Sequence, residues 1–346
     1  MSAGTFFKTF SSSDRTSTRT LLHEAIPITG TLISGTYAAS SGRGVNIKTF
    51  SHGMFQSIYD YPYLSSSANH IFDVSVGISK DSSASGSSSD HIQMSKKRNM
   101  YNQMAQMLVG YDISGSIRQF DADGDLSSGT KHDDIIILNF SRLLVKDEIK
   151  KGSFKLDLGN NATYAAPFTS INYITDTGAE TSYKINSPAG EYGLLKSSGN
   201  NVGLLYYQAG IAILTSSVFD VNGTGSMDSA GNTMFRMMTG STIDTIGDAV
   251  TRRISDINFN NTTELNSTVY FCRANHNEFN YSSNPTFLTG SKIRVKGEDP
   301  TAPTKTYVTT VGLYSADNEL LAVAKLSEPL RKDPTNELTL RVRLDY

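Results

Sequence analysis

The sequence predicts an α+β, β-rich fold, in which antiparallel sheets are accompanied by about two amphipathic helices. Short apolar runs bounded by Gly, Asn, Asp and Ser recur along most of the 346 residues, which is typical of strands and turns. Two segments instead place apolar residues at the three- and four-residue spacing of a helix with one buried face. The 17 Tyr and 16 Phe residues argue against disorder, because disordered chains are poor in aromatic residues.

The first eighty residues are expected to form an arm followed by strands. The arm, to about residue 20, is rich in Ser and Thr, and we expect it to order only on assembly. Residues 21–37 alternate imperfectly and contain Gly30 and Gly35, which favours two strands joined by a turn. Residues 72–78 (FDVSVGI) alternate cleanly between apolar and small or polar residues, which predicts a half-buried strand.

A helix is predicted over residues 91–109, after a Ser-rich loop. Asp90 is placed to cap its first amides, and Gly110 stands where a helix end favours a left-handed residue. The apolar residues on one face are Met100, Tyr101, Met104, Met107 and Leu108. Such a methionine stripe usually belongs to a core, and the alternative is a contact surface, because Met repacks easily.

The middle of the chain predicts further strands and a second helix. Residues 134–140 (DIIILNF) indicate a buried strand, followed by a short turn or helix ending at Gly152. Residues 203–214 indicate two strands around a turn at Gln208, Ala209 and Gly210. Residues 154–158 and 269–273 are predicted to form two more strands. The second helix is expected over residues 242–256, with Ile243, Ile246, Val250 and Ile254 on its inner face.

The last forty residues carry the clearest pattern. Residues 307–314 (YVTTVGLY) and 320–326 predict a hairpin around a short polar loop. Pro329 and Pro334 are expected to interrupt the next stretch, because proline cannot donate to a strand ladder. A final strand, residues 338–344, alternates Leu and Val with Thr and Arg. We expect it to close the hairpin's sheet, because short loops cost less entropy to close; the alternative is addition to a partner's sheet.

These elements divide the chain into three predicted segments. They are an N-terminal arm and β segment (1–80), a central β-rich domain with the first helix (81–221), and a C-terminal domain with the second helix, the hairpin and the terminal strand (222–346). The most linker-like stretches are the Ser-rich residues 82–89 and the Gly- and Ser-rich residues 222–231.

The composition and net charge argue against two classes of binding partner, nucleic acids and membranes. The net charge of −2 gives no signature of nucleic-acid binding, and we interpret Lys96, Lys97 and Arg98 as a solvated helix face. No stretch has the roughly 18 apolar residues of a membrane span, and the first twenty residues lack the apolar region of a secretion signal. We therefore expect a protein made in the cytoplasm, without a nucleic-acid or membrane partner. Cys272 is the single cysteine, so an intrachain disulfide is excluded.

The sequence carries no motif that assigns an enzyme activity. A nucleophile elbow, a P-loop, a zinc-protease motif and a dinucleotide fingerprint are all missing, and the six His residues are scattered. Asp121, Asp123 and Asp125 resemble the start of a calcium loop, but Leu126 and His132 stand where that loop needs Gly and Glu. We interpret them as a polar turn, with a lone structural cation as the alternative. No catalytic, cofactor, metal or small-molecule site is predicted, although paired carboxylates for glycoside cleavage meet only in three dimensions.

Several segments resemble one group of proteins. TYVTTVGLY, LLAVAKLSEPL and TNELTLRVRLDY at the end are similar to the ends of virion proteins of contractile-tailed marine phages. TSTRTLLHEAIPITGTLISGTY near the start and FSRLLVKDEIKKGSFKLDL in the middle resemble the same T-even-like, cyanophage-like group. The resemblance implies a non-enzymatic wedge component of the tail baseplate, located in the virion and present in several copies among other tail proteins. The alternatives are a neck or connector protein, or a tail-associated protein that binds or cleaves glycans.

For an assembling subunit the candidate site is a contact surface. Its predicted residues come from the methionine stripe, from the hairpin and from the terminal strand. They are Met100, Met104, Met107, Tyr307, Tyr314, Leu338, Leu340, Val342 and Leu344.

Overall fold

The computed structural model describes residues 7–30, 44–85, 92–219, 225–282, 287–289, 292–295, 301 and 303–346. The contacts divide the chain into two compact units: unit 1 takes residues 1–21 and 264–346, and unit 2 takes residues 22–263. Both unit boundaries fall inside strands, β1 (Arg15–Thr29) and β12 (Ile254–Ala274). They therefore differ from the predicted segment boundaries near residues 80 and 221. Gly35, Asp90 and residues 86–89 of the Ser-rich loop lie outside the described residues.

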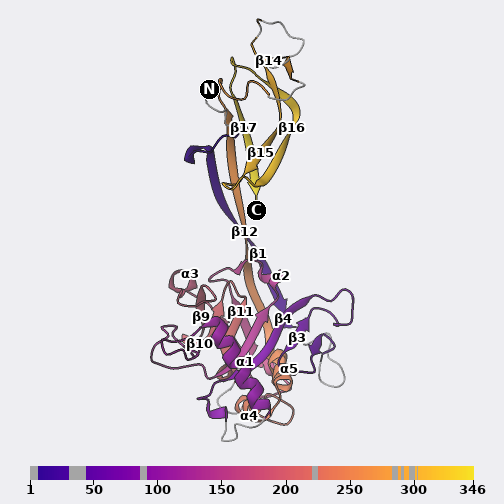
Figure 1. Cartoon of the computed structure of the whole chain (residues 1–346). Helices are drawn as coiled ribbons and strands as arrows, with labels where there is room; N and C mark the ends of the chain where they lie inside the picture. Colours follow the sequence, from indigo (N-terminus) through magenta and orange to yellow (C-terminus); the bar gives the residue numbers. More distant parts are fainter. Residues whose placement is uncertain are drawn as a thin grey trace. The chain divides into compact units, whose positions relative to one another are not determined.

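Unit 2 is built on one large antiparallel sheet, which confirms the prediction of a β-rich fold (Figure 1). The strand order is β1-β12-β7-β8-β9-β10-β11-β5-β4-β3-β2, and β6 pairs with β12 beside this path. The bounds are β2 (Ile47–Thr49), β3 (Gln56–Tyr59), β4 (His70–Ile78), β5 (Asp134–Phe140), β6 (Glu148–Ile149), β7 (Lys155–Gly159), β8 (Ile171–Thr175), β9 (Tyr192–Ser197), β10 (Asn200–Tyr206) and β11 (Ile211–Thr215). The predicted turn at residues 208–210 joins β10 to β11.

The centre of this sheet is buried on both faces. Ile136 and Leu138 of β5 belong to one apolar cluster, whereas Ile135 and Ile137 belong to a second one. The predicted half-burial of β4 is therefore wrong, because helices cover both faces. At Gly77 of β4 an added Cβ would lie 3.0 Å from the Cα of Tyr101, so this close approach of a helix depends on glycine.

Two long helices cover the sheet, and the described residues hold three short ones besides. Their bounds are α1 (Ile92–Leu108), α2 (Arg142–Val145), α3 (Ala179–Ser182), α4 (Met234–Gly240) and α5 (Ile243–Arg253). α1 confirms the first predicted helix, and Gly110 after it has the expected positive φ of 82°. The Thr242 hydroxyl caps α5 by accepting from the Thr245 amide at 3.2 Å. The predicted extension to residue 256 is wrong, because Ile254 begins β12 and pairs with Leu158 of β7.

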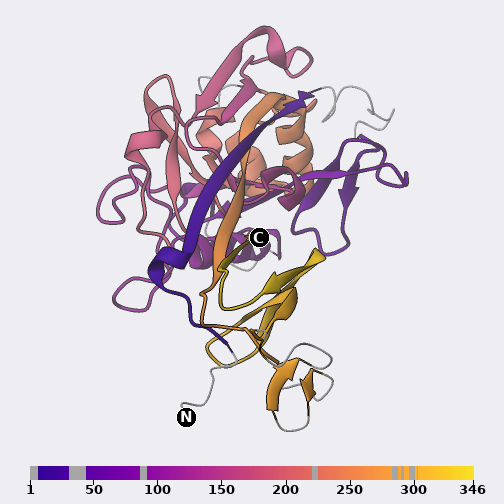
Figure 2. The same ribbon diagram turned by 90° about the horizontal axis from the view of Figure 1, so that it is seen from above.

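Unit 1 is a smaller assembly of strands. β17 (Leu338–Asp345) pairs antiparallel with residues 267–274 of β12. The hairpin of β15 (Thr306–Tyr314) and β16 (Leu320–Lys332) forms a two-stranded sheet of its own (Figure 2). A third pair joins β13 (Leu288–Thr289) to β14 (Lys292–Val295). The terminal strand therefore does not close the hairpin's sheet, and that prediction is wrong.

Register explains two departures from the expected C-terminal pattern. Leu340 and Val342 of β17 stand opposite Cys272 and Tyr270 of β12, so the apolar face of β17 meets an apolar face that lies far away in sequence. Pro329 does not end the hairpin strand, which continues to Lys332. The ladder jumps from Lys325 to Leu330 opposite β15, so the proline lies in a bulge where no amide donor is needed.

Candidate assembly surface

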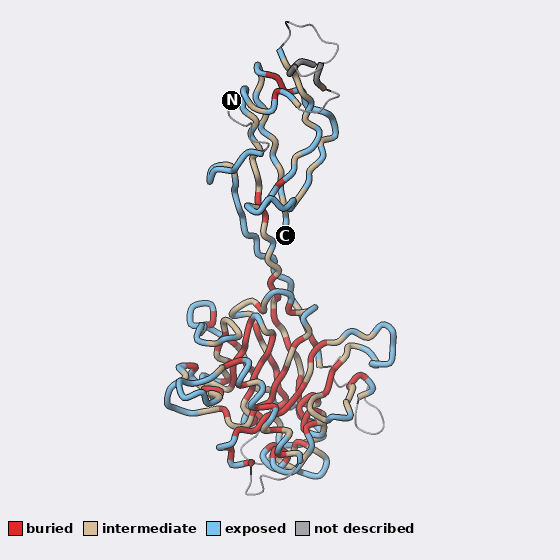
Figure 3. The backbone as a smooth tube through the Cα atoms, in the orientation of Figure 1, coloured by how far each residue is buried: buried red, intermediate tan, exposed pale blue. Residues whose placement is uncertain are grey.

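Unit 1 carries many apolar side chains but almost no core of its own. Among its residues with described burial, Leu313 is the one buried hydrophobic side chain, with 6% of its surface exposed. Both buried apolar clusters of the chain consist of unit 2 residues. Figure 3 shows the same contrast: buried residues are concentrated in unit 2, whereas the described residues of unit 1 are mostly exposed or intermediate.

Several exposed apolar residues of unit 1 lie on the β15–β16 hairpin. Tyr314 pairs with Leu320, and Gly312 pairs with Val323 in the β15–β16 ladder. The Tyr314 ring and the Leu320 side chain both lie within 3.3 Å of the position of a Cβ added to Gly312, so they cover this glycine together. Tyr307, Tyr314, Leu320 and Val323 are 52–58% exposed. These four residues are called the hairpin patch below.

The structure separates the nine predicted contact residues into three groups. Tyr307 and Tyr314 are exposed and belong to the hairpin patch. The β17 residues Leu338, Leu340, Val342 and Leu344 are half-buried, and Thr339, Arg341, Arg343 and Asp345 between them are exposed. In unit 2, Met100 is buried in the core, Met104 is partly buried against both clusters, and Met107 is half exposed.

Sequence reasoning missed two residues of the hairpin patch. Leu320 and Val323 lie in an apolar strand in which both faces look alike, so alternation did not distinguish the exposed face. The signal that identifies them is the ladder register, because residues directly opposite each other in antiparallel strands share a face. Gly312, without a side chain, leaves the centre of that face open for the Tyr314 ring.

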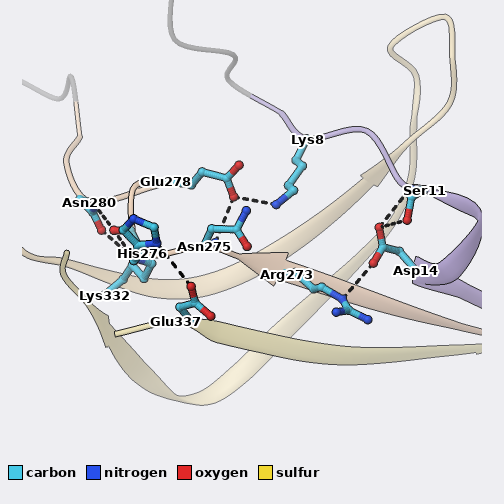
Figure 4. Close-up of polar contacts among 10 residues, drawn as sticks. All are labelled: Lys8, Ser11, Asp14, Arg273, Asn275, His276, Glu278, Asn280, Lys332 and Glu337. Carbon is cyan, nitrogen blue, oxygen red and sulfur yellow. Dashed lines mark hydrogen bonds and ion pairs between the residues drawn. The ribbon is translucent and has the colours of Figure 1, made fainter. Parts of the chain in front are cut away.

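A buried lysine ties the end of the hairpin to the loop that follows β12. Lys332 is fully buried, and its Nζ donates to Asn280 Oδ1 at 2.6 Å, to the Asp333 carbonyl at 2.9 Å and to the His276 carbonyl at 3.3 Å. Asn280 Nδ2 donates to the same His276 carbonyl at 2.7 Å (Figure 4). A buried charge is tolerated only when such partners satisfy it. Hydrogen bonds, and not an apolar core, therefore hold the end of the hairpin in place.

Exposed polar contacts also hold the N-terminal arm against β12 and its loop (Figure 4). Lys8 Nζ lies 2.7 Å from Glu278 Oε2, and Arg273 Nε lies 2.9 Å from Asp14 Oδ1. The Ser11 hydroxyl and amide donate to Asp14, and these bonds lower the pKa of its carboxyl below the ordinary value. Exposed ion pairs each contribute little, typically about 0–1 kcal/mol. The arm is ordered by several weak contacts.

The Asp121, Asp123 and Asp125 turn is held by the chain itself. One oxygen from each carboxylate lies within 4.8 Å of the others. Asp121 Oδ1 accepts from Lys131 Nζ at 2.9 Å, and its Oδ2 accepts from the Leu126 amide at 2.8 Å. Burial raises the pKa of Asp121. Because a lysine and a backbone amide occupy both oxygens of the buried carboxylate, the geometry fits the polar turn better than a cation site.

A second titratable cluster surrounds Asp176 and is structural. Asp176 Oδ1 accepts from the Phe154 amide at 3.0 Å, and Oδ2 accepts from the Gly152 amide at 2.7 Å and the Tyr207 hydroxyl at 3.1 Å. Burial raises the pKa of Asp176 and of Tyr207. A carboxyl group with a raised pKa, such as that of Asp176, has the property that a general acid needs. It is nevertheless fully engaged and buried, so it cannot reach a substrate.

Lys97 corrects the interpretation of the basic triplet on α1. It is fully buried rather than solvated, and its Nζ donates to the Met238 carbonyl at 2.5 Å near the C-terminal end of α4. The last carbonyls of a helix lack partners within the helix and carry partial negative charge, which favours a cation there. Burial lowers the pKa of Lys97 to about 8.

No family model, no curated protein and no solved structure matches the chain. Among the described helices, none combines the length and apolar character that crossing a membrane requires.

Proposed function

We propose that this chain is a non-enzymatic structural subunit of a contractile phage tail, a wedge component of the baseplate, which joins other tail proteins through unit 1. The observation that carries the proposal is the exposed hairpin patch on a unit that has one buried hydrophobic side chain among its described residues. The sequence segments that resemble phage virion proteins include both strands of this hairpin.

Physical chemistry supports contact with a neighbour at this surface. An isolated two-stranded hairpin is at best marginally stable in water, and it needs a third strand or a packed face. Contiguous exposed apolar residues on a soluble protein commonly mark an interaction site. A neighbouring subunit that covers the hairpin patch would supply the apolar burial that unit 1 does not provide for Tyr307, Tyr314, Leu320 and Val323.

The titratable clusters support assembly rather than catalysis. The buried oxygens of Asp121 and Asp176 accept from donors of the chain itself. The ammonium groups of Lys97 and Lys332 likewise donate to carbonyl and amide oxygens of the chain. Groups satisfied in this way stabilise a fold, whereas a catalytic acid or base must reach the reacting atom within hydrogen-bond distance.

Mass spectrometry of purified virions and of tails separated from heads tests the proposal. We expect the chain at a fixed stoichiometry in the baseplate fraction. Its presence in the neck fraction would support the connector alternative, and its absence from virions would contradict a structural role. Glycan binding on an array, or release of reducing sugars, would instead support the glycan-directed alternative.

Complementation of a phage that lacks the gene tests the surface. The double variant Tyr314→Ser with Val323→Ser is expected to fold and to fail to enter tails. The matched control is Leu143→Ser on α2 of unit 2, where the side chain is 82% exposed and lies outside the hairpin patch. Equal incorporation of the double variant and the control would contradict the assignment of the hairpin patch.

A further inference from the structure

The first described residues of the chain are attached to the rest of unit 1 through side-chain contacts. Residues 7–14 precede β1, so they lie outside the ladder that joins β1 to β12. All of them are exposed except Asp14, which is half-buried. Within the segment the Asp14 amide donates to the Ser11 carbonyl at 3.1 Å and closes one short turn. Residues 7–14 are called the arm segment below.

Two ion pairs hold the two ends of the arm segment (Figure 4). Lys8 Nζ lies 2.7 Å from Glu278 Oε2, and Asp14 Oδ1 lies 2.9 Å from Arg273 Nε. The groups that receive the arm segment belong to β12 and to the loop after it. Glu278 Oε2 also accepts from the Asn275 amide at 3.0 Å, so its own loop orients this carboxylate without help from the arm segment.

A contact between two aromatic rings lies between the ion pairs in sequence. The ring centroids of Phe10 and Tyr270 are 5.3 Å apart, and the rings are tilted by 45°. Tyr270 stands opposite Val342 in the β12–β17 ladder, so Phe10 contacts the sheet on the face that carries both side chains. Phe10 keeps 40% of its surface exposed in this contact. The apolar part of the attachment is therefore small.

Salt should weaken these contacts. The four ionic side chains are solvent-accessible, from 14% exposure at Asp14 to 52% at Arg273. Exposed ion pairs are weak, and salt shortens the range of their attraction from about 10 Å at 0.1 M to about 3 Å at 1 M. Because ordering a segment costs conformational entropy, one half-exposed ring contact is a small gain to set against that cost. The two ion pairs therefore decide whether the arm segment stays in place.

We propose that the arm segment is an electrostatic latch, which the two ion pairs hold closed on β12 and its loop and which opens when they are screened. Opening exposes the rings of Phe10 and Tyr270, while β1 keeps its pairing with β12. A local change between an ordered and a disordered segment is a common basis of conformational switches. The inference concerns the isolated chain and goes beyond the proposed function.

Tryptophan fluorescence of the full-length chain tests the latch. The chain contains no tryptophan, so Phe10→Trp introduces a single reporter. We expect its anisotropy to fall and its emission to shift to longer wavelength as NaCl rises from about 0.05 M to about 1 M. The matched control is Phe168→Trp in unit 2, because Phe168 has a similar exposure of 42%. A reporter at position 10 that responds to salt no more than this control would overturn the proposal.

Variants of Lys8 in the Phe10→Trp background test the ion pair directly. Lys8→Glu places a second carboxylate beside Glu278, and we expect low anisotropy already at low salt. Lys8→Arg keeps the charge and should behave like its parent. Lys325→Glu makes the same charge change at an exposed position of β16, and the latch should stay closed.

Two outcomes of this series would overturn the latch. One is a Lys8→Glu chain that stays closed at low salt. The other is equal opening by Lys8→Glu and Lys325→Glu, which would make net charge the cause instead of the ion pair. Neither outcome depends on whether virions contain the chain, so the latch and the proposed function can fail separately.

Discussion

Unit 2 and unit 1 are both built from antiparallel strands, but they stabilise those strands by different means. In unit 2 the central strands β4 and β5 are buried on both faces among aliphatic and aromatic side chains. Among the described residues of unit 1 the buried set is mainly polar, with Ser267, Thr268, Asn280, Lys332 and Asp333 beside the apolar Leu313. Apolar burial is the main favourable term in folding, and unit 2 obtains far more of it than unit 1 does.

The local sequences already differ in a way that explains this contrast. β5 reads DIIILNF, with four apolar residues in succession, and a strand of that kind needs cover on both faces. β17 reads LTLRVRLD, in which Thr, Arg and Asp occupy every second position and are exposed. A strand with one polar face can bury apolar side chains on its other face alone. The comparison shows that similar strand content can produce either a self-sufficient core or an incomplete one.

The largest expected effect on stability follows from removing an aromatic ring from the core of unit 2. Phe140 packs 5.3 Å from Phe259, 5.9 Å from Phe154 and 6.0 Å from Phe72, measured between ring centroids. Phe140→Ala is expected to lower the free energy of unfolding by about 3–5 kcal/mol through lost burial and a cavity. Urea unfolding measures this change in free energy, and hydrogen exchange at β4 and β5 locates it. Leu143→Ala, at an exposed position, is the control. A loss no larger than the control's would contradict the assigned core.

The second effect is a pH dependence from the buried Lys97. Its pKa is about 8 in the folded chain and 10.5 in the unfolded chain, so between these values the unfolded chain binds more protons. Stability should therefore rise with pH across this window, by roughly 3 kcal/mol in total. Lys97→Met should remove that rise. Urea midpoints from pH 7.5 to 10 compare the two chains, and parallel pH profiles would refute the burial of this ammonium.

The third effect tests whether polar contacts hold unit 1. Lys332→Met would leave Asn280 Oδ1 and the carbonyls of His276 and Asp333 without this donor. We expect a loss of about 1–3 kcal/mol, the cost of unpaired buried polar groups. Amide exchange in β15 and β16 should accelerate, and exchange in β5 should stay unchanged. Lys325→Met, at an exposed position of the same strand, is the control and should change neither.

The smallest expected effect concerns the hairpin patch. Val323→Ser and Tyr314→Ser should each change the free energy of unfolding of the isolated chain by no more than about 0.5 kcal/mol, because exposed positions tolerate substitution. Thermal unfolding of dilute protein measures this change. A loss comparable to that of Phe140→Ala would mean that these side chains pack within the monomer. Unit 1 would then have an apolar core of its own, as unit 2 does.

Much of the local structure could be predicted from sequence because it depends on neighbours in the chain. α1 begins and ends within one residue of the predicted helix, and the strand at residues 134–140 has the predicted bounds. The hairpin of β15 and β16 follows from two apolar runs around a polar loop. Of the candidate site, the exposed Tyr307 and Tyr314 were predicted, whereas Leu320 and Val323 required the observed register.

The errors arise where partners lie far apart in sequence. β17 pairs with β12 rather than with the nearby hairpin, because an apolar face was available there at residues 270 and 272. Lys97 is buried because α4, about 140 residues later, presents its last carbonyls at that point. Ile254 fits a helical stripe equally well, but β7 offers it a strand partner. Local patterns hold no information on which of several compatible partners is nearest in space.

The sequence by itself determined the β-rich character, the main helices and the alternation that divides each strand into faces. Those properties follow from side-chain chemistry and backbone preference within a few residues. Tertiary structure decided which faces are covered: helices bury both faces of β4 and β5, whereas the hairpin patch of unit 1 remains exposed. Burial is a property of the whole packed arrangement, so a strand's sequence states what it can bury, and only the assembled fold decides whether it is buried.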